Sequence, residues 1–133
     1  MAIKKAVRPT GAELDILHVL WKRGPSTVRG VHEIVGRESS TRYTTTLKLL
    51  QNMTEKSLVA RDESRHAHIY KANVPQERTL RELAGDLLDR AFGGSAESLV
   101  MHALKARKVT PEEAARIRKM LEEVEGGKAR GEV

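Results

Sequence analysis

Cysteine is absent from this sequence of 133 residues, and aromatic residues make up only 3% of it. The absence of cysteine excludes disulfide bonds, thiolate nucleophiles and cysteine-ligated metal sites, and it agrees with an intracellular location. The scarcity of aromatic residues disfavours binding of single-stranded RNA, because such binding stacks unpaired bases on Phe, Tyr or Trp side chains.

The sequence also lacks a long apolar run. No stretch approaches the roughly 18 apolar residues of a membrane-spanning helix. The basic start, MAIKKAVRPT, is without the apolar stretch of a signal peptide. We therefore expect a soluble, cytoplasmic protein that does not associate with membranes.

Motifs for catalysis or metal binding are missing as well. The sequence shows no Gly-rich phosphate loop and no nucleophile paired with a general base, so we expect no enzymatic activity and no cofactor. His66 and His68 are predicted to lie on one face of a strand, but zinc needs three or four ligands. The other three of the five histidines are scattered over separate predicted helices, so we predict no metal site.

The charge is distributed unevenly along the chain. The formal net charge is +6; residues 1–73 contain 13 Lys and Arg against 7 Asp and Glu, whereas residues 74–133 contain 11 of each kind. The whole surplus therefore lies in the first part, which indicates a polyanion-binding part joined to a neutral part. A basic, solvated surface without a partner is the alternative.

The first part is predicted to begin with two short helices. The string TGAE at residues 10–13 has the spacing of a capping box and begins the first helix. Gly24-Pro25 ends that helix. Ser26-Thr27 supplies the cap of a second helix, which we expect to end at Gly36.

The third predicted helix begins in STRYTTTLKLL, residues 39–49, an unusual helix start. Threonine and tyrosine form helices poorly, each costing up to about 0.7 kcal/mol relative to alanine. At 100° per residue, Thr46, Leu49, Leu50 and Met53 share one side, which we expect to face the core. The threonines on the other side are either a cluster of capping side chains or a surface that contacts nucleic acid.

The polar side of this helix suits DNA recognition. Short side chains near a helix start reach base edges and phosphates in the major groove without holding the backbone away. The threonine hydroxyl donates and accepts hydrogen bonds, and its methyl group can meet the thymine methyl. The helix N-terminus adds a positive partial charge. The candidate residues are Arg42, Thr44, Thr45 and Lys48.

A hairpin is predicted to follow, with strands at residues 58–62 and 67–72. Two strands alone are marginally stable, so the hairpin must pack on the helices. Its candidate DNA contacts are Arg61, Arg65 and His66, which are placed to bind phosphates or to enter the adjacent minor groove. Solvated charge without a partner is the alternative here.

Residues 74–125 are predicted to form three further amphipathic helices. The first ends at Gly93-Gly94, Ser95 caps the second, and residues 110–113 form a capping box for the third. Three short helices have too small a core to be stable alone. We therefore expect residues 74–125 to form a homodimerisation domain next to a DNA-binding domain at residues 1–73, and residues 126–133 to be a disordered tail.

The chain resembles the penicillinase-repressor family of winged-helix transcription regulators, which includes the β-lactamase and methicillin-resistance repressors. The resemblance extends from Pro9 to Val124. It is carried by PTGAELDILHVLWKRGPSTVRGVHEIV, RYTTTLKLLQNMTEKSLVARDESRHAHIYKA and LLDRAFGGSAESLV. It implies an N-terminal winged helix, a C-terminal helical dimerisation segment and repression through a palindromic operator.

The resemblance also implies roles for particular residues. The third helix of such proteins contacts the major groove, which implies contacts from Arg42, Tyr43, Thr44, Thr45 and Lys48, and the wing corresponds to Arg61–His68. The best-known members are cleaved by a regulatory protease at an Asn–Phe bond. The matching position here is His102-Ala103, so that scissile pair is absent, and the C-terminal cysteine pair of the copper-responsive branch is absent too.

We therefore predict a mainly α-helical protein with a small β-hairpin that acts as a dimeric, sequence-specific repressor on double-stranded operator DNA. The alternative is a protein-interaction adaptor whose winged helix does not bind specific DNA.

Overall fold

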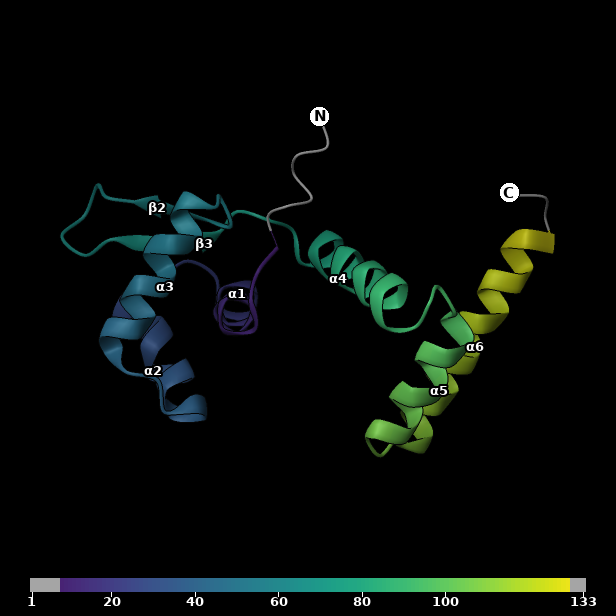
Figure 1. Cartoon of the computed structure of the whole chain (residues 1–133). Helices are drawn as coiled ribbons and strands as arrows, with labels where there is room; N and C mark the ends of the chain where they lie inside the picture. Colours follow the sequence, from purple (N-terminus) through teal and green to yellow (C-terminus); the bar gives the residue numbers. More distant parts are fainter. Residues whose placement is uncertain (1–7, 130–133) are drawn as a thin grey trace. The chain divides into compact units, whose positions relative to one another are not determined.

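The computed structural model describes residues 8–129 and is mainly helical, with one small antiparallel sheet (Figure 1). The chain divides into two compact units between Gly85 and Asp86. This division lies inside α4, Gln76–Ala91.

The first unit contains three helices and a three-stranded sheet. Its elements, in chain order, are α1 (Gly11–Arg23), β1 (Ser26–Thr27), α2 (Val28–Ser39), α3 (Tyr43–Glu55), β2 (Val59–Asp62) and β3 (Ile69–Ala72). The strand order is β1-β3-β2, and both pairings are antiparallel. The sequence predicted only the hairpin β2–β3, because β1 has two residues and shows no alternating pattern.

The core of this unit lies between the helices and the inner face of the sheet. The predicted stripe of α3 is confirmed: Thr46, Leu50 and Met53 are buried, and Leu49 packs against the core from its edge. The buried hydrophobic residues are Ile16, Leu17, Val19, Leu20, Val31, Val35, Leu50, Met53, Leu58, Val59 and Tyr70.

The capping box of α1 is present and has a second function. The Thr10 hydroxyl accepts a hydrogen bond from the amide of Glu13, and the Glu13 carboxylate accepts one from the amide of Thr10. The carboxylate is only 3% exposed, and both its oxygens lie 2.9 Å from Nζ of Lys56. Because Lys56 is the C-cap residue of α3, this ion pair joins the start of α1 to the end of α3.

Helix α2 is longer than the sequence suggested. It continues through Gly36 to Ser39 and ends at Ser40, which adopts a left-handed conformation with φ 55°. Gly36 is required for a different reason than ending the helix. A Cβ atom there would lie 2.8 Å from Cε1 of His32, so the missing side chain makes room for the imidazole ring.

The hairpin strands are shorter than expected, and the loop between them is longer. Residues 63–68 form the loop, and the paired residues run from Val59↔Ala72 to Asp62↔Ile69. His66 and His68 therefore lie in the loop and do not share a strand face.

Two contacts in the first unit fix the segment that leads to α4. Nε1 of Trp21 donates a hydrogen bond of 3.0 Å to the carbonyl oxygen of Val74. The Thr79 hydroxyl, buried in the first turn of α4, donates one to the carbonyl oxygen of Pro75. The fluorescence of Trp21, the single tryptophan, therefore reports on the folding of this unit.

The second unit contains the end of α4, α5 (Ala96–Ala106) and α6 (Pro111–Ala129). Gly93 and Gly94 have positive φ angles of 58° and 83° and separate α4 from α5, and the Ser95 hydroxyl caps α5, as predicted. Helix α6 continues to Ala129, so residues 126–129 are helical where a disordered tail was expected, and residues 130–133 lie outside the described residues. Among the described helices, none is long and apolar enough to cross a membrane.

We predict that Lys56→Ala lowers the free energy of unfolding by about 1–3 kcal/mol, because the buried Glu13 carboxylate loses its charged partner. Urea unfolding followed by Trp21 fluorescence measures this change. Arg81→Ala is the matched control, since Arg81 is 71% exposed in its pair with Glu77 and such pairs contribute about 0.2–1 kcal/mol or less. Equal midpoints for the two variants would contradict the role of the buried pair.

Candidate nucleic-acid interface

The first turn of α3 presents polar side chains to solvent. Arg42, Thr44, Thr45 and Lys48 are at least partly exposed, and Tyr43 is 44% exposed. Thr46 points the other way and is fully buried. The three consecutive threonines are therefore not a cluster of capping side chains: two face solvent and one belongs to the core.

The start of α3 also differs chemically from the starts of its neighbours. Hydroxyl side chains cap α1, α2 and α5, whereas Arg42 at the N-cap of α3 makes no side-chain hydrogen bond to the first turn. The first amides of a helix and its dipole both attract anions. At the start of α3, the positive charge of Arg42 adds to the attraction that the free amides and the helix dipole exert on an anion.

A groove of about 520 Å³ lies beside this turn, between α2, α3 and the hairpin loop. Its basic and imidazole side chains come from two elements, namely α2 and the loop, and none of the lining residues is acidic. A second hollow, between α1 and α2, is lined partly by Asp15 and Glu38. The lining of the groove is Thr27, Val28, Arg29, Tyr43, Leu47, His66, Ala67, His68 and Tyr70.

Sequence reasoning missed Arg29 as a member of this groove, whereas His68 belongs to the wing that the family resemblance implied. Arg29 is one of several exposed basic residues, and no local pattern distinguishes it. Its position follows from β1, because the pairing Thr27↔Ile69 places the start of α2 beside the end of the loop. A strand of two residues gave no signal from which this proximity could be predicted.

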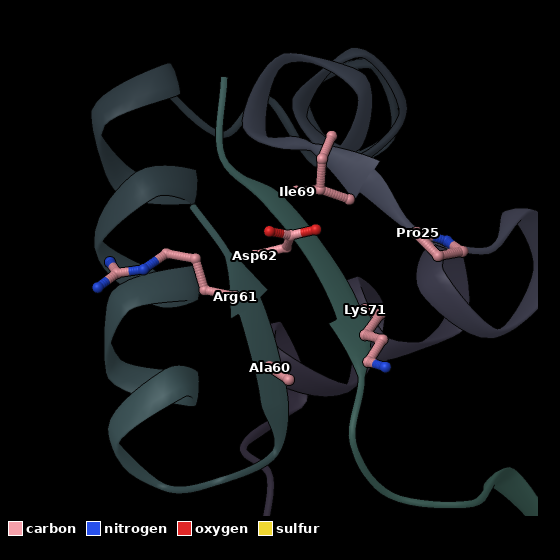
Figure 2. Close-up of a pocket in the computed structure, with 6 residues that line it drawn as sticks. All are labelled: Pro25, Ala60, Arg61, Asp62, Ile69 and Lys71. Carbon is pink, nitrogen blue, oxygen red and sulfur yellow. The ribbon is translucent and has the colours of Figure 1, made fainter. Parts of the chain in front are cut away.

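Arg61 is held more tightly than the other candidate residues. Its guanidinium lies 2.6 Å from the Glu63 carboxylate, and a side-chain hydrogen bond with Tyr70, followed by the charge of Glu63, raises the pKa of Arg61. Arg61 pairs across the sheet with the buried Tyr70, so its side chain lies on the inner face. In Figure 2 it extends away from Pro25 and Lys71.

The other residues of Figure 2 line a shallow hollow on the outer face of the sheet, with Ala60, Ile69 and Pro25 beside the opposite charges of Asp62 and Lys71. Asp62, the last residue of β2, also contacts the hairpin loop. Its carboxylate accepts hydrogen bonds from the hydroxyl and the amide of Ser64, at 2.7 and 2.9 Å. These bonds lower the pKa of the Asp62 carboxyl and order the first residues of the loop.

No group of three or more His, Asp or Glu side chains within residues 8–129 is arranged to hold a metal ion. His102 and Ala103, where the family resemblance places a regulatory cleavage, lie inside α5. Nδ1 of His102 is 2.8 Å from the carbonyl oxygen of Ser98, and its ring lies 5.6 Å from that of Phe92. A protease would have to unfold this turn to bind it in an extended form.

Three helices packed on an antiparallel hairpin, with an exposed third helix, define a winged-helix fold of the kind found in DNA-binding regulators. The chain belongs to the penicillinase repressor family, whose model matches residues 9–123. The members of this family are transcriptional regulators.

Similar proteins agree with this assignment. The transcriptional regulator BlaI of Mycobacterium tuberculosis is 31% identical over 125 residues, covering 92% of this chain and 89% of BlaI. The penicillinase repressor of Staphylococcus aureus is 20% identical and covers 90% of this chain and 95% of its own. Among solved structures, a mutant of E. coli MarR in complex with operator DNA has a TM-score of 0.50 at 15% identity, covering 91% of this chain and 79% of its own, which supports the fold.

We predict that the Asp62 carboxyl titrates below the ordinary value of an aspartate, and that Ser64→Ala raises its pKa, because the hydrogen bond from the Ser64 hydroxyl to the charged form is removed while the bond from the backbone amide remains. A pH titration of the Asp62 side-chain carbonyl resonance by NMR measures both values. Since the folded pKa is the lower one, the contribution to stability is present above the ordinary value and is lost as the pH falls through the folded value. The same resonance in the urea-unfolded chain serves as the reference; a midpoint for Asp62 in the folded protein that is no lower than in the unfolded chain would be inconsistent with this assignment.

Proposed function

We propose that this chain is a dimeric, sequence-specific repressor that occupies a palindromic operator through α3 and the wing, the hairpin β2–β3 with its loop. One observation carries the proposal: the exposed turn of Thr44, Thr45 and Lys48 lies next to a groove without carboxylates. Membership of a family of transcriptional regulators supports it.

In this proposal the first turn of α3 enters the major groove. Thr44 and Thr45 present hydroxyl and methyl groups to base edges, and Lys48 follows one turn later with a donor that suits guanine. Arg42 lies at the N-terminus of the helix, where it and the free amides favour a phosphate. Tyr43 lines the groove beside α3 and packs against the neighbouring phosphate and sugar.

The wing supplies the sequence-independent part of the affinity. Arg65 and His66 are exposed in the loop, and Arg29 contributes from the start of α2. Arg29 and Arg65 place positive charge along the path of a phosphate backbone beside the groove, His66 adds a polar ring, and contacts of this kind set the register of the protein on the duplex. Arg61 contributes less, because its guanidinium already binds Glu63 and Tyr70.

The second unit is proposed to hold the two chains of the dimer together. No described side chain between residues 86 and 127 is buried, although α5 and α6 are amphipathic. A helical unit without a core of its own is stabilised by burying its apolar surface against a partner. The residues left exposed are Leu87, Val100, Met101, Leu104, Met120, Leu121 and Val124, at 43–69%.

A second copy of the same chain is the partner that fits this surface best. Residues 74–133 have balanced charge, so two copies can approach without net repulsion. A two-fold dimer would present two α3 helices, and its target would consist of two half-sites related by the same symmetry.

We predict that Thr44→Ala weakens binding to the specific site by about 1–3 kcal/mol while random DNA is bound as before, because only base contacts are lost. Arg65→Ala should weaken both kinds of DNA and reduce the slope of log K against log salt concentration by about 1. Gel shifts at two salt concentrations with a duplex selected from a random pool measure both effects. Arg81→Ala is the control for general loss of charge, and equal losses on both DNAs for the threonine variant would defeat the base-contact assignment.

We also predict that light scattering gives twice the chain mass of 14.8 kDa, and that Leu104→Glu combined with Val124→Glu shifts the protein to the single mass, because the apolar surface then carries buried charge. Lys119→Glu, on an exposed position of α6, is the matched control and should stay dimeric. A single-chain mass for the unaltered protein at micromolar concentration would overturn the dimer.

A further inference from the structure

We infer that His32 is a positioning residue for DNA recognition: its ring, clamped between α2 and α3, sets the rotation of the first turn of α3 and with it the direction of Thr44 and Thr45. This inference rests on the proposed function. It names a residue that does not itself contact DNA and that controls how well the contacting residues are aligned.

Two contacts join His32 to α3. Nδ1 of His32 lies 3.0 Å from the hydroxyl oxygen of the fully buried Thr46. The imidazole ring meets the ring of Tyr43 edge to face, with centroids 5.4 Å apart and an interplanar angle of 82°. The contacts are of two kinds, one polar and one aromatic, and each restricts a different side chain of the same helical turn.

The hydrogen bonds of this cluster are directional. The Thr46 hydroxyl lies 3.4 Å from the carbonyl oxygen of Arg42, to which it is oriented as a donor. A hydroxyl that donates to this oxygen has its lone pairs free to accept from Nδ1–H of His32. The imidazole is thereby linked through Thr46 to the N-cap residue of α3.

Helix geometry explains why these two contacts orient the threonines. Tyr43 and Thr46 are three residues apart and lie on the same side of α3, whereas the residues between them are turned away by about 100° each. With Tyr43 and Thr46 both held against the α2 side, Thr44 and Thr45 must face outward. A rotation of the turn would move both hydroxyls sideways relative to base edges, and recognition tolerates little misplacement.

Gly36 is the third residue that determines the position of the His32 ring, after Thr46 and Tyr43. A Cβ atom at this position would approach Cε1, Nε2 and Nδ1 of the His32 ring to 2.8, 3.1 and 3.2 Å. The ring therefore lies directly over the backbone of α2, one turn after its own Cα. Replacing Gly36 by alanine would displace the imidazole without altering any residue that faces DNA.

This arrangement allows a test in which the altered residue lies away from the DNA. The probes are the duplex that the unaltered full-length chain selects from a random pool and a shuffled duplex of the same composition. The measured quantity is the ratio of their dissociation constants, here called the discrimination ratio. Thermal unfolding of each variant, followed by Trp21 fluorescence, records stability separately.

We expect His32→Leu, Thr46→Val and Gly36→Ala each to lower the discrimination ratio about tenfold, the value of roughly one good base contact, with the affinity for shuffled DNA unchanged. His32→Asn keeps a polar group near the position of Nδ1 and should recover part of the ratio. Gly85→Ala is the matched control, because a Cβ atom at Gly85 in α4 meets nothing within 4 Å.

The double variant His32→Leu/Thr44→Ala distinguishes positioning from a purely structural role. If His32 aligns Thr44, the threonine change costs little once the alignment is lost, and the two effects are not additive. A histidine that only fills space would lower the melting temperature, leave the ratio intact and give additive effects, and this result would overturn the inference. Loss of folding in both Gly36→Ala and His32→Asn would overturn it as well.

The proposed function and the inference fail in distinguishable ways. If the unaltered chain itself shows a discrimination ratio near one, sequence-specific binding is wrong. If that ratio is high and every folded variant retains it, the positioning role of His32 is wrong while the proposed function stands.

Discussion

The orientation of α3 depends on the buried carboxylate of Glu13. This one group completes the capping box at the start of α1 and receives Lys56 from the end of α3. A buried carboxylate without a cation is strongly unfavourable, so the two helix ends cannot separate without a large cost. At its other end α3 is held by His32 through Thr46 and Tyr43. The helix is thus attached by polar contacts at both ends, and Leu50 and Met53 pack its middle into the core.

The two units differ in how many of their side chains are buried. Among its described residues, the first unit buries eleven hydrophobic side chains, and none of its buried polar side chains lacks a hydrogen-bond partner. The second buries none of its described side chains between residues 86 and 127. Helix α4 extends across the division between the units as one continuous helix.

Local sequence signals predicted the fold where local physics decides it. The capping box at Thr10, the glycine pair after α4 and the buried stripe of α3 all follow from spacing alone, and the exposure of Thr44 follows from the same helical periodicity. The errors arose where a distant contact decides. Gly36 suggested a helix end, but the His32 ring explains it. The ion pair of Arg61 with Glu63 likewise gave no signal in the sequence. Strand β1 and the membership of Arg29 in the groove depend on pairing with β3, which no local pattern of two residues reveals.

Thr27 connects the sheet to helix α2. Its backbone pairs with Ile69 in the sheet, while its hydroxyl accepts a hydrogen bond from the amide of Gly30 and caps α2. Thr27 is therefore both the last residue of β1 and the N-cap residue of α2. Because Thr27 links β3 to α2, and α2 packs on α3, we expect a movement of the hairpin to be accompanied by a movement of these helices. In the proposed function, contact of the loop with the phosphate backbone and entry of α3 into the major groove would therefore be coupled.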